Sequence, residues 1–263
     1  YAYLNNSDPE DTGGWHRFKR ETIGEPPTIY SDSLTTMTAF DMQAYLQYKG
    51  WLQAQVIPQR SPRKKKMRVS YYALPGPRYY IDSVNYNSPD STVNALLQES
   101  KDQSTFKPGA PLDLSRFSSE KQRITNLMRN SGYAEFYQNQ IGDLELDTFQ
   151  TAGKANLYIT VFPPYGEDAH QKYFIGDIDV YQDYTIDQSN ITGDTVIAGI
   201  RFFLSDRGFI INPTTFRKAI SLRPGEQFSQ EEFSRTNEQL SDLGVFRFVR
   251  IKQIPDPQQK DII

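Results

Sequence analysis

Apolar residues recur at helical spacing between Asp113 and Gly132, in the clearest periodic stretch of the chain. The buried face would comprise Leu114, Phe117, Ile124, Leu127 and Met128, with Ser118, Glu120, Gln122 and Arg123 left for solvent. Asp113 is suited to cap the first turn, and Leu112 can pack on Phe117 as a hydrophobic staple. Gly132 stands where a left-handed residue ends a helix, and an extended segment follows. The pattern predicts a unit of helix, glycine stop and strand.

Elsewhere the period changes from helical to alternating, which predicts strands. The expected strands cover residues 52–56, 67–73, 78–86, 134–141, 154–162, 173–181 and 246–254, with a turn at 58–66 between the first two. Shorter helices are expected at residues 15–22, from Thr38 to Gly50, and at 91–98. The middle of the chain therefore has the order strand, helix, helix, strand, strand, which is an α+β arrangement.

Two segments of this order return later in the chain. Residues 80–85 align with residues 174–179 at an offset of 94 (174 − 80). Lys107-Pro108-Gly109 aligns with Arg223-Pro224-Gly225 at an offset of 116 (224 − 108). The later copy therefore carries 22 additional residues (116 − 94), which fall within residues 182–212.

The helix of the later copy repeats both signals of the first. Ser229 and Glu232 predict a capping box, and Gly244 repeats the glycine stop. A third and more divergent copy ends at Gly50. The sequence thus predicts three modules of one kind, joined by short linkers.

Three such modules resemble POTRA domains, the polypeptide-transport-associated modules of the BamA/TamA superfamily. The residues that carry this resemblance are KPG at 107–109, RPGE at 223–226, NSGY at 130–133 and LSDLGVF at 240–246. IGEPP at 23–27, the run at 123–136 and His170 before Tyr173 are further similar to the lipoprotein branch called TamL. The resemblance implies tandem α+β modules, each a three-stranded mixed sheet with two helices on one face.

The expected modules are residues 1–76, partial and with an irregular N-terminal segment, 77–165, and 166–263. The last carries the insertion near 182–212 and ends where its third strand would begin. The chain starts at Tyr1 without an initiator methionine, so we expect a fragment of a longer protein. The resemblance implies the periplasmic portion of an outer-membrane protein, attached through a missing C-terminal barrel and through an N-terminal lipid.

In POTRA domains the second strand is an exposed edge, and an extended peptide can add to such an edge by β-augmentation. Carrying this over, the resemblance implies partner-binding residues Ala134, Phe136, Gln138 and Gln140 in one module and Phe246, Phe248 and Arg250 in the next. The expected partners are unfolded outer-membrane protein clients, periplasmic partner proteins, or both. The alternative is a pure docking scaffold for a periplasm-spanning TamB-like partner or for accessory lipoproteins.

The insertion contains an apolar patch that could serve docking. Ile200, Phe202 and Phe203, with Leu204 beside them, are flanked by polar and glycine-containing segments. Apolar residues in a loop more often bury against their own domain, so a lid over the sheet of this module is the favoured interpretation.

Composition and charge narrow the function classes. A net charge of −3 argues against nucleic acid as a partner, and the absence of cysteine excludes a thiolate metal site. Basic residues gather at 60–68, where a hairpin turn could contact anionic lipid or an acidic partner, although a solvated turn is favoured.

Candidate chemistry is sparse. The two histidines, His16 and His170, have no second imidazole at ligand spacing and are expected to be solvated. Asp143, Glu145 and Asp147 alternate along one expected strand face, which favours a wet hairpin over a cation site. We therefore expect no enzyme, no catalytic residues, no metal and no cofactor; a wall-active hydrolase using Asp143 or Glu145 is the remaining enzymatic alternative.

Overall fold

The computed structural model describes residues 29–184 and 189–263. By its internal contacts the chain divides into an N-terminal part ending at Arg78 and a C-terminal part from Tyr79 to Ile263. The predicted boundary at 76/77 lies two residues before this division, and the predicted boundary at 165/166 falls inside the C-terminal part. The helix expected at 15–22 lies outside the described residues.

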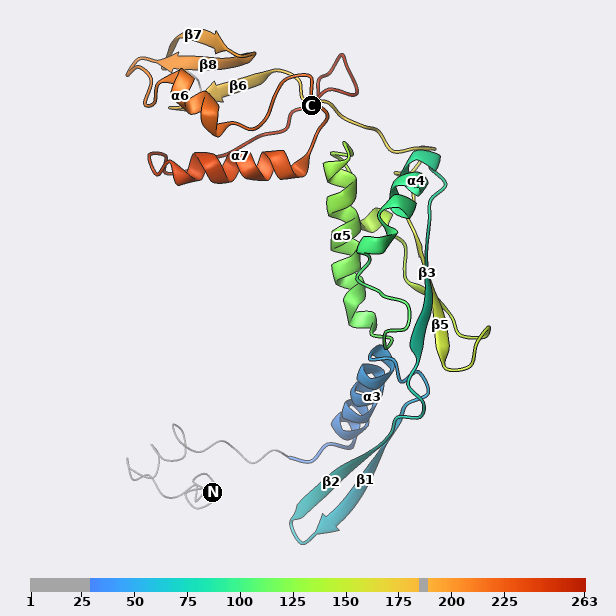
Figure 1. Cartoon of the computed structure of the whole chain (residues 1–263). Coiled ribbons are helices and arrows are strands. Elements are labelled where there is room, and N and C mark those ends of the chain that lie inside the picture. The colour runs from blue at the N-terminus through green and yellow to red at the C-terminus, as the bar shows by residue number, and fades with distance from the viewer. Residues whose placement is uncertain (1–28, 185–188) are drawn as a thin grey trace, which may run out of the picture. The chain divides into compact units, whose positions relative to one another are not determined.

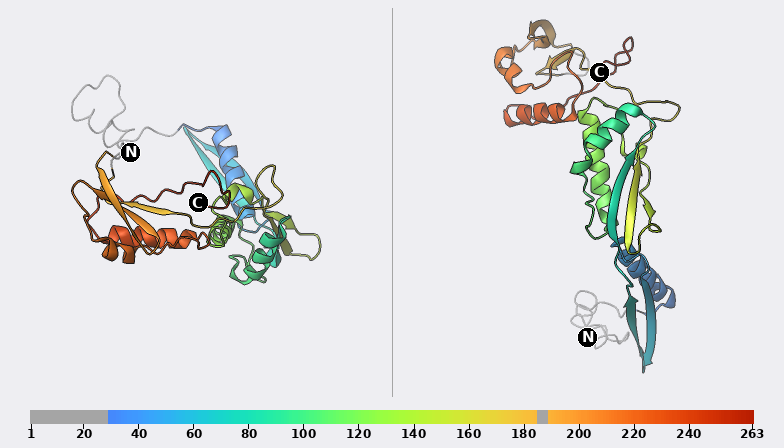
Figure 2. Two further views of the ribbon diagram at one scale, coloured as in Figure 1. Left: turned by 90° about the horizontal axis from the view of Figure 1, so that it is seen from above. Right: turned by 45° about the vertical axis from the view of Figure 1, so that its right-hand side comes forward.

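The N-terminal part consists of one helix beside a β-hairpin (Figures 1 and 2). Its elements are α3 (Asp32–Tyr48), β1 (Gln55–Arg63) and β2 (Lys66–Leu74). α3 begins earlier than the predicted Thr38 because the Ser31 side chain accepts a hydrogen bond from the Leu34 amide at 3.3 Å. Gly50, with φ 95°, ends it as expected. The turn expected at 58–66 is wrong, because the strands continue to a two-residue turn at Lys64-Lys65.

The second module, at the start of the C-terminal part, has the predicted order of strand, helix, helix, strand, strand. Its elements are β3 (Tyr80–Asn87), α4 (Ser91–Glu99), the 3-10 turns η2 (Lys101–Gln103) and η3 (Leu114–Arg116), α5 (Phe117–Asn130), η4 (Gln138–Gln140), β4 (Glu145–Asp147) and β5 (Lys154–Thr160). β5 is central, parallel to β3 and antiparallel to β4. Both helices lie on one face of the sheet (Figure 1). The α+β prediction is confirmed here.

The strand expected at 134–141 is wrong. Ala134 and Phe136 are buried, and the Phe136 amide donates to the Tyr133 carbonyl in a turn. Only Ile141 makes a bridge, to Val161, before the chain reaches β4. Burial of these apolar side chains below the end of α5 fixes the segment as a turn, and the second strand forms further along.

The third module reaches the same sheet layout by a different chain order. Its elements are β6 (Ile178–Tyr181), β7 (Ile191–Ile197), β8 (Ile200–Ser205), α6 (Pro213–Phe216), η5 (Arg217–Ala219) and α7 (Gln230–Asp242). β8 is central, parallel to β6 and antiparallel to β7, as β5 is to β3 and β4. All three described strands precede the helices, which differs from the predicted order. The start of the predicted third strand is nevertheless present after α7, where Ile262 pairs in parallel with Phe174, the counterpart of Tyr80 in β3.

The strand expected at 246–254 is also wrong, because this segment is irregular. The hairpin of β7 and β8 occupies the central and edge positions that the later segment was expected to fill. The additional residues of the third module are therefore strands of its sheet.

The repeat holds at the level of single hydrogen bonds. The Gly109 amide donates to the Ile81 carbonyl at 2.7 Å, and the Gly225 amide donates to the Ile175 carbonyl at 2.7 Å. The Leu112 amide likewise donates to the Tyr79 carbonyl at 2.9 Å. Its counterpart is the bond from Phe228 to Tyr173, also 2.9 Å. The offsets of 94 and 116 seen in the sequence are confirmed as matching backbone contacts.

A buried polar cluster ties α5 to the segment before it. Glu120, expected to face solvent, is fully buried and accepts hydrogen bonds from the Thr105 amide at 2.7 Å and from the Tyr86 hydroxyl at 2.6 Å. Arg123 pairs with the same carboxylate at 2.6 Å. The prediction for Glu120 is wrong because the preceding loop folds over the helix and needs an acceptor there.

Candidate functional site: the open edges of the sheets

Each described three-stranded sheet leaves its hairpin's first strand, β4 or β7, at an edge. β4 has three residues, which is too short to template a long extended peptide, whereas β7 has seven. β7 alternates between half-buried and exposed residues along its whole length. Among the described residues, β7 is therefore the longer of the two hairpin strands that lie at a sheet edge.

The backbone groups that β7 turns outward follow from its two-residue turn. Ala198 and Gly199 both have positive φ, at 49° and 78°, as a tight hairpin turn requires. The residues flanking such a turn exchange hydrogen bonds with each other, and alternate residues point away from the partner strand. The N–H and C=O groups of Asp194 and Val196 therefore face the open side, and the Val196 side chain is 60% exposed.

The second-module residues expected to bind partners are placed differently from the prediction. Ala134 and Phe136 are buried and lie in a turn, so they form no strand edge in the structure. Gln138 and Gln140 lie in η4, where the Gln138 side chain donates to Gln122 at 2.8 Å. The Gln140 carbonyl accepts from the Phe162 amide at 2.8 Å. The structure does not bring these residues together as a strand.

The third-module residues are likewise not in a strand. Phe246 packs edge-on against Phe216, with ring centroids 5.5 Å apart. Phe248 is 82% exposed and Arg250 is exposed. Their alternation matched the pattern of a strand, but they pair with no other strand within residues 29–184 and 189–263.

The apolar patch of the insertion is part of the core. Ile200 and Phe202 are fully buried in β8, and Phe203 on the opposite face stacks on Tyr181 with centroids 4.4 Å apart. The side chains of Ile200 and Phe202 therefore form no exposed patch in the structure. The favoured lid interpretation also needs correction, because the segment is the central strand of the sheet.

His170, expected to be solvated, is buried. Its ring packs against Tyr133 and Phe136, with centroids 5.8 and 5.5 Å away. Its Nδ1 lies 3.4 Å from Asp90, and its backbone amide donates to the same carboxylate at 2.9 Å. Burial lowers the pKa of His170, although the Asp90 carboxylate opposes this. His170 therefore fastens the linker between the modules to the N-terminus of α4, while His16 lies outside the described residues.

The remaining chemical candidates do not converge. Across residues 29–184 and 189–263, no three His, Cys, Asp or Glu side chains gather as a metal site. Glu145 and Asp147 lie in β4, and Asp143 precedes it. Within the same residues no helix has the length and apolar character needed to cross a membrane.

Comparison with known proteins gives distant likenesses to solved structures. No family model and no curated protein matches the chain. POTRA domains 3 to 5 of BamA from Haemophilus influenzae are 12% identical, with 90% of this chain and 80% of that chain covered and a TM-score of 0.41. POTRA domains 1 to 3 of the periplasmic domain of Omp85 from Anabaena are 13% identical, with 91% and 81% covered and a TM-score of 0.30. BamA from Haemophilus ducreyi lacking POTRA domains 1 to 3 is 16% identical over 52% of this chain and 24% of that chain, at a TM-score of 0.37.

The sequence missed β7, because β7 lies in the segment assigned to an insertion. It did predict the strand at 67–73, which is most of β2, but it did not identify the outer edge of that strand as open. A signal was present in β7, where ITGDTVI alternates and is followed by Ala198-Gly199 and the apolar run of β8. For β2 the signal was the absence of proline, in contrast to β1.

Proposed function

We propose that this chain is part of the periplasmic arm of an outer-membrane protein assembly or translocation machine, and that it binds extended polypeptides by strand addition. The observation that carries the proposal is the exposed edge of β7, whose outward backbone groups at Asp194 and Val196 can pair with an added strand. The POTRA-like motifs of the sequence supply the setting.

Strand addition suits clients of this kind. Outer-membrane barrel strands are extended and alternate apolar with polar residues, so one backbone edge can pair with many different sequences. Backbone pairing needs no side-chain code, which agrees with an edge of mixed composition.

Photo-crosslinking to a synthetic barrel-strand peptide tests the proposal. The wild-type chain is expected to capture a peptide of about ten alternating Val and Thr residues that carries a benzophenone group. Val196→Pro removes an outward N–H without removing a bond to β8, so crosslinking should fall several-fold while the circular dichroism spectrum is kept. Val196→Thr retains the N–H and serves as the matched control.

The docking-scaffold alternative makes a different prediction. A scaffold would retain one stable, stoichiometric partner in a pull-down from periplasmic extract and would ignore the strand peptide. Absence of peptide capture by the wild-type chain at every edge would contradict strand addition and leave the scaffold.

A further inference from the structure

The hairpin of the N-terminal part lacks one neighbour that both other hairpins have. In the second and third modules, the second strand of the hairpin (β5 or β8) is central, with a parallel strand (β3 or β6) on its other side. β2 is the second strand of its hairpin, but within residues 29–78 only β1 pairs with it. The place of a parallel strand beside β2 is therefore open among the described residues.

The opposite edge of this hairpin, on β1, is closed to further pairing. The tight turn at Lys64-Lys65 makes the even-numbered residues of β1 face away from β2. Two of these, Pro58 and Pro62, have no N–H, and the Val56 amide donates to the Gln43 side chain at 3.3 Å. Prolines of this kind protect an edge against strand addition.

β2 contains no proline, and its outward groups form a continuous edge. By the same alternation, the N–H and C=O groups of Met67, Val69, Tyr71 and Ala73 face away from β1. A strand added there could pair with the outward backbone groups of these four alternate residues. One edge of the hairpin is thus blocked and the other is available.

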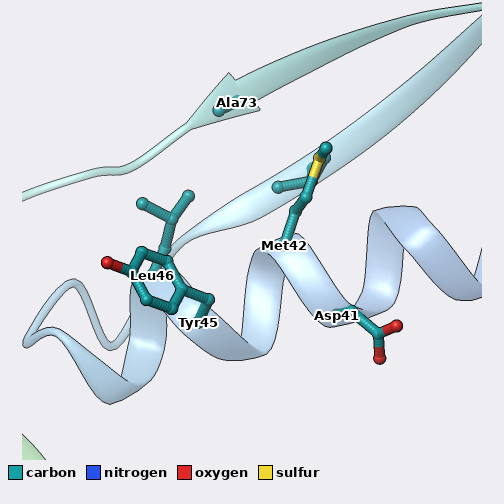
Figure 3. Close-up of a pocket in the computed structure, with 6 residues that line it drawn as sticks. Asp41, Met42, Tyr45, Leu46 and Ala73 are labelled. Carbon is teal, nitrogen blue, oxygen red and sulfur yellow. The ribbon is translucent and has the colours of Figure 1, made fainter.

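An apolar pocket opens beside the C-terminal half of this edge. It is lined by Asp41, Met42, Tyr45, Leu46, Val56 and Ala73. Figure 3 shows Met42 projecting from α3 toward the strands, with Asp41 pointing away. Tyr45 is 61% exposed and Met42 is 42% exposed. The inward side chains of an added strand would cover these two residues.

The N-terminal half of the same edge is strongly basic. Arg63, Lys64, Lys65, Lys66 and Arg68 are all exposed, and none of them has an ion pair with the rest of the described chain. Arg60, by contrast, pairs with Asp32 at 2.5 Å. Five cations gathered at one end of an open edge favour carboxylates at the matching end of a ligand.

We infer that the outer edge of β2 receives an extended segment of a partner protein, parallel to β2, with carboxylates in its N-terminal half and apolar side chains in its C-terminal half. The parallel direction follows β3 and β6, which run parallel to β5 and β8. In that direction the carboxylates meet Lys66 and Arg68, and the apolar side chains reach Met42 and Tyr45. The inference rests on the proposed function of strand addition and assigns it a second acceptor edge with its own specificity.

Fluorescence anisotropy with labelled peptides on the full chain tests the direction and the charge pattern. The probe is the peptide EVEVTVTFT, with KVKVTVTFT and the reversed sequence TFTVTVEVE as controls. The wild-type chain should bind the first peptide at least about tenfold more tightly than either control, because only it matches both halves in the parallel direction. Equal binding of all three peptides would overturn the inference.

Three variants locate the site. Tyr71→Pro removes an outward N–H and should weaken binding about tenfold, whereas Tyr71→Thr should bind as the wild type does. Lys66→Glu combined with Arg68→Glu should reverse the preference, so that the lysine peptide binds better. Wild-type affinity of Tyr71→Pro, or no reversal in the charge variant, would overturn the assignment to β2.

The remaining outcomes separate other occupants and the broader proposal. Peptide binding that appears only after deletion of residues 1–28 would mean that the chain's own N-terminus occupies the edge. Displacement of the peptide by phosphatidylglycerol vesicles, with Tyr71→Pro unaffected, would make the basic cluster a membrane contact. A concentration-dependent dimer abolished by Tyr71→Pro would assign the edge to a second copy, and each of these three results would overturn the inference. If Val196→Pro impairs capture of the barrel-strand peptide while Tyr71→Pro binds EVEVTVTFT as tightly as the wild type does, the proposed function stands and only the β2 site fails.

Discussion

Glu120 places a charged side chain in the interior of the second module. Burial by itself would raise the pKa of Glu120, but hydrogen bonds from Arg123, Tyr86 and Thr105 outweigh it and hold the pKa below its ordinary value. In the third module the same helix position holds Thr236, whose hydroxyl accepts from the Ser221 amide at 3.0 Å. The amides of Thr105 and Ser221 occupy the same position in the two modules, and each is bonded by a different kind of side chain.

Replacing this carboxylate is expected to destabilise the second module strongly. Glu120→Gln keeps the shape but leaves the buried Arg123 guanidinium without a counter-charge, which costs about 3 kcal/mol in the free energy of unfolding. Glu232→Gln removes one of the two carboxylates that pair with Arg235 on the exposed surface of α7 and should cost less than about 1 kcal/mol. Urea denaturation of both variants measures the difference, and equal losses would contradict the role assigned to Glu120.

His170 is expected to make stability fall as the solution is acidified. Its pKa is lowered in the folded protein, so the unfolded chain binds a proton more readily, and stability is lost as pH falls below the ordinary histidine value of about 6.5. Between about pH 7.5 and 5.5, the His170→Gln variant should lose less stability than the wild type. Denaturation of both proteins at both pH values measures this. A His170→Gln profile parallel to that of the wild type would show that the buried ring does not titrate as proposed.

At the scale of elements, the third module shows how far local sequence pattern determines the fold. Lys107-Pro108-Gly109 and Arg223-Pro224-Gly225 were predictive because each turn needs a glycine with positive φ, at 80° and 82°, to present its amide to a strand carbonyl. The second and third strands were harder to place, since alternation shows only that a segment can be extended. Tertiary contacts decide which extended segment joins the sheet. In the third module, β7 and β8 occupy the positions for which the alternating residues after Gly244 were predicted.

Substitutions in β8 distinguish a core strand from a surface patch. Phe202→Ala empties a fully buried position and should cost about 3–5 kcal/mol of unfolding free energy. Phe203→Ala removes a half-exposed ring that stacks on Tyr181 and should cost about 1 kcal/mol. Chemical denaturation followed by tyrosine fluorescence reports both. Similar small effects would mean that β8 is dispensable, as a docking element would be.

At the scale of the whole molecule, the two parts differ in how much apolar surface they bury. The described core of the N-terminal part contains only small or medium apolar residues, namely Ala39, Ala54 and Val56. The fully buried phenylalanines, Phe106, Phe136, Phe202 and Phe228, all lie in the C-terminal part. A two-stranded hairpin depends on packing against a helix for its stability, and here that packing buries few apolar side chains.

Native-state hydrogen exchange should reflect this difference. Amides of α3, β1 and β2 are expected to exchange faster than those of β3 and β5, because local opening of the N-terminal part exposes little apolar surface. The acidic peptide should slow exchange in β2 selectively, with β7 serving as the internal reference. Uniform protection along the chain would show that the N-terminal part is stabilised by contacts that its own core does not explain.

The hairpin that precedes the helices of the third module also bears on the order in which the chain can fold. The parallel pair of β3 and β5 cannot form until the chain beyond both helices is present, whereas β6 and β8 are separated by about a third as many residues. A chain that is synthesised from its N-terminus would therefore pair the strands of the third sheet before α7 is available. The backbone groups of these strands would then be satisfied early, during the interval in which an incomplete chain is most prone to aggregate.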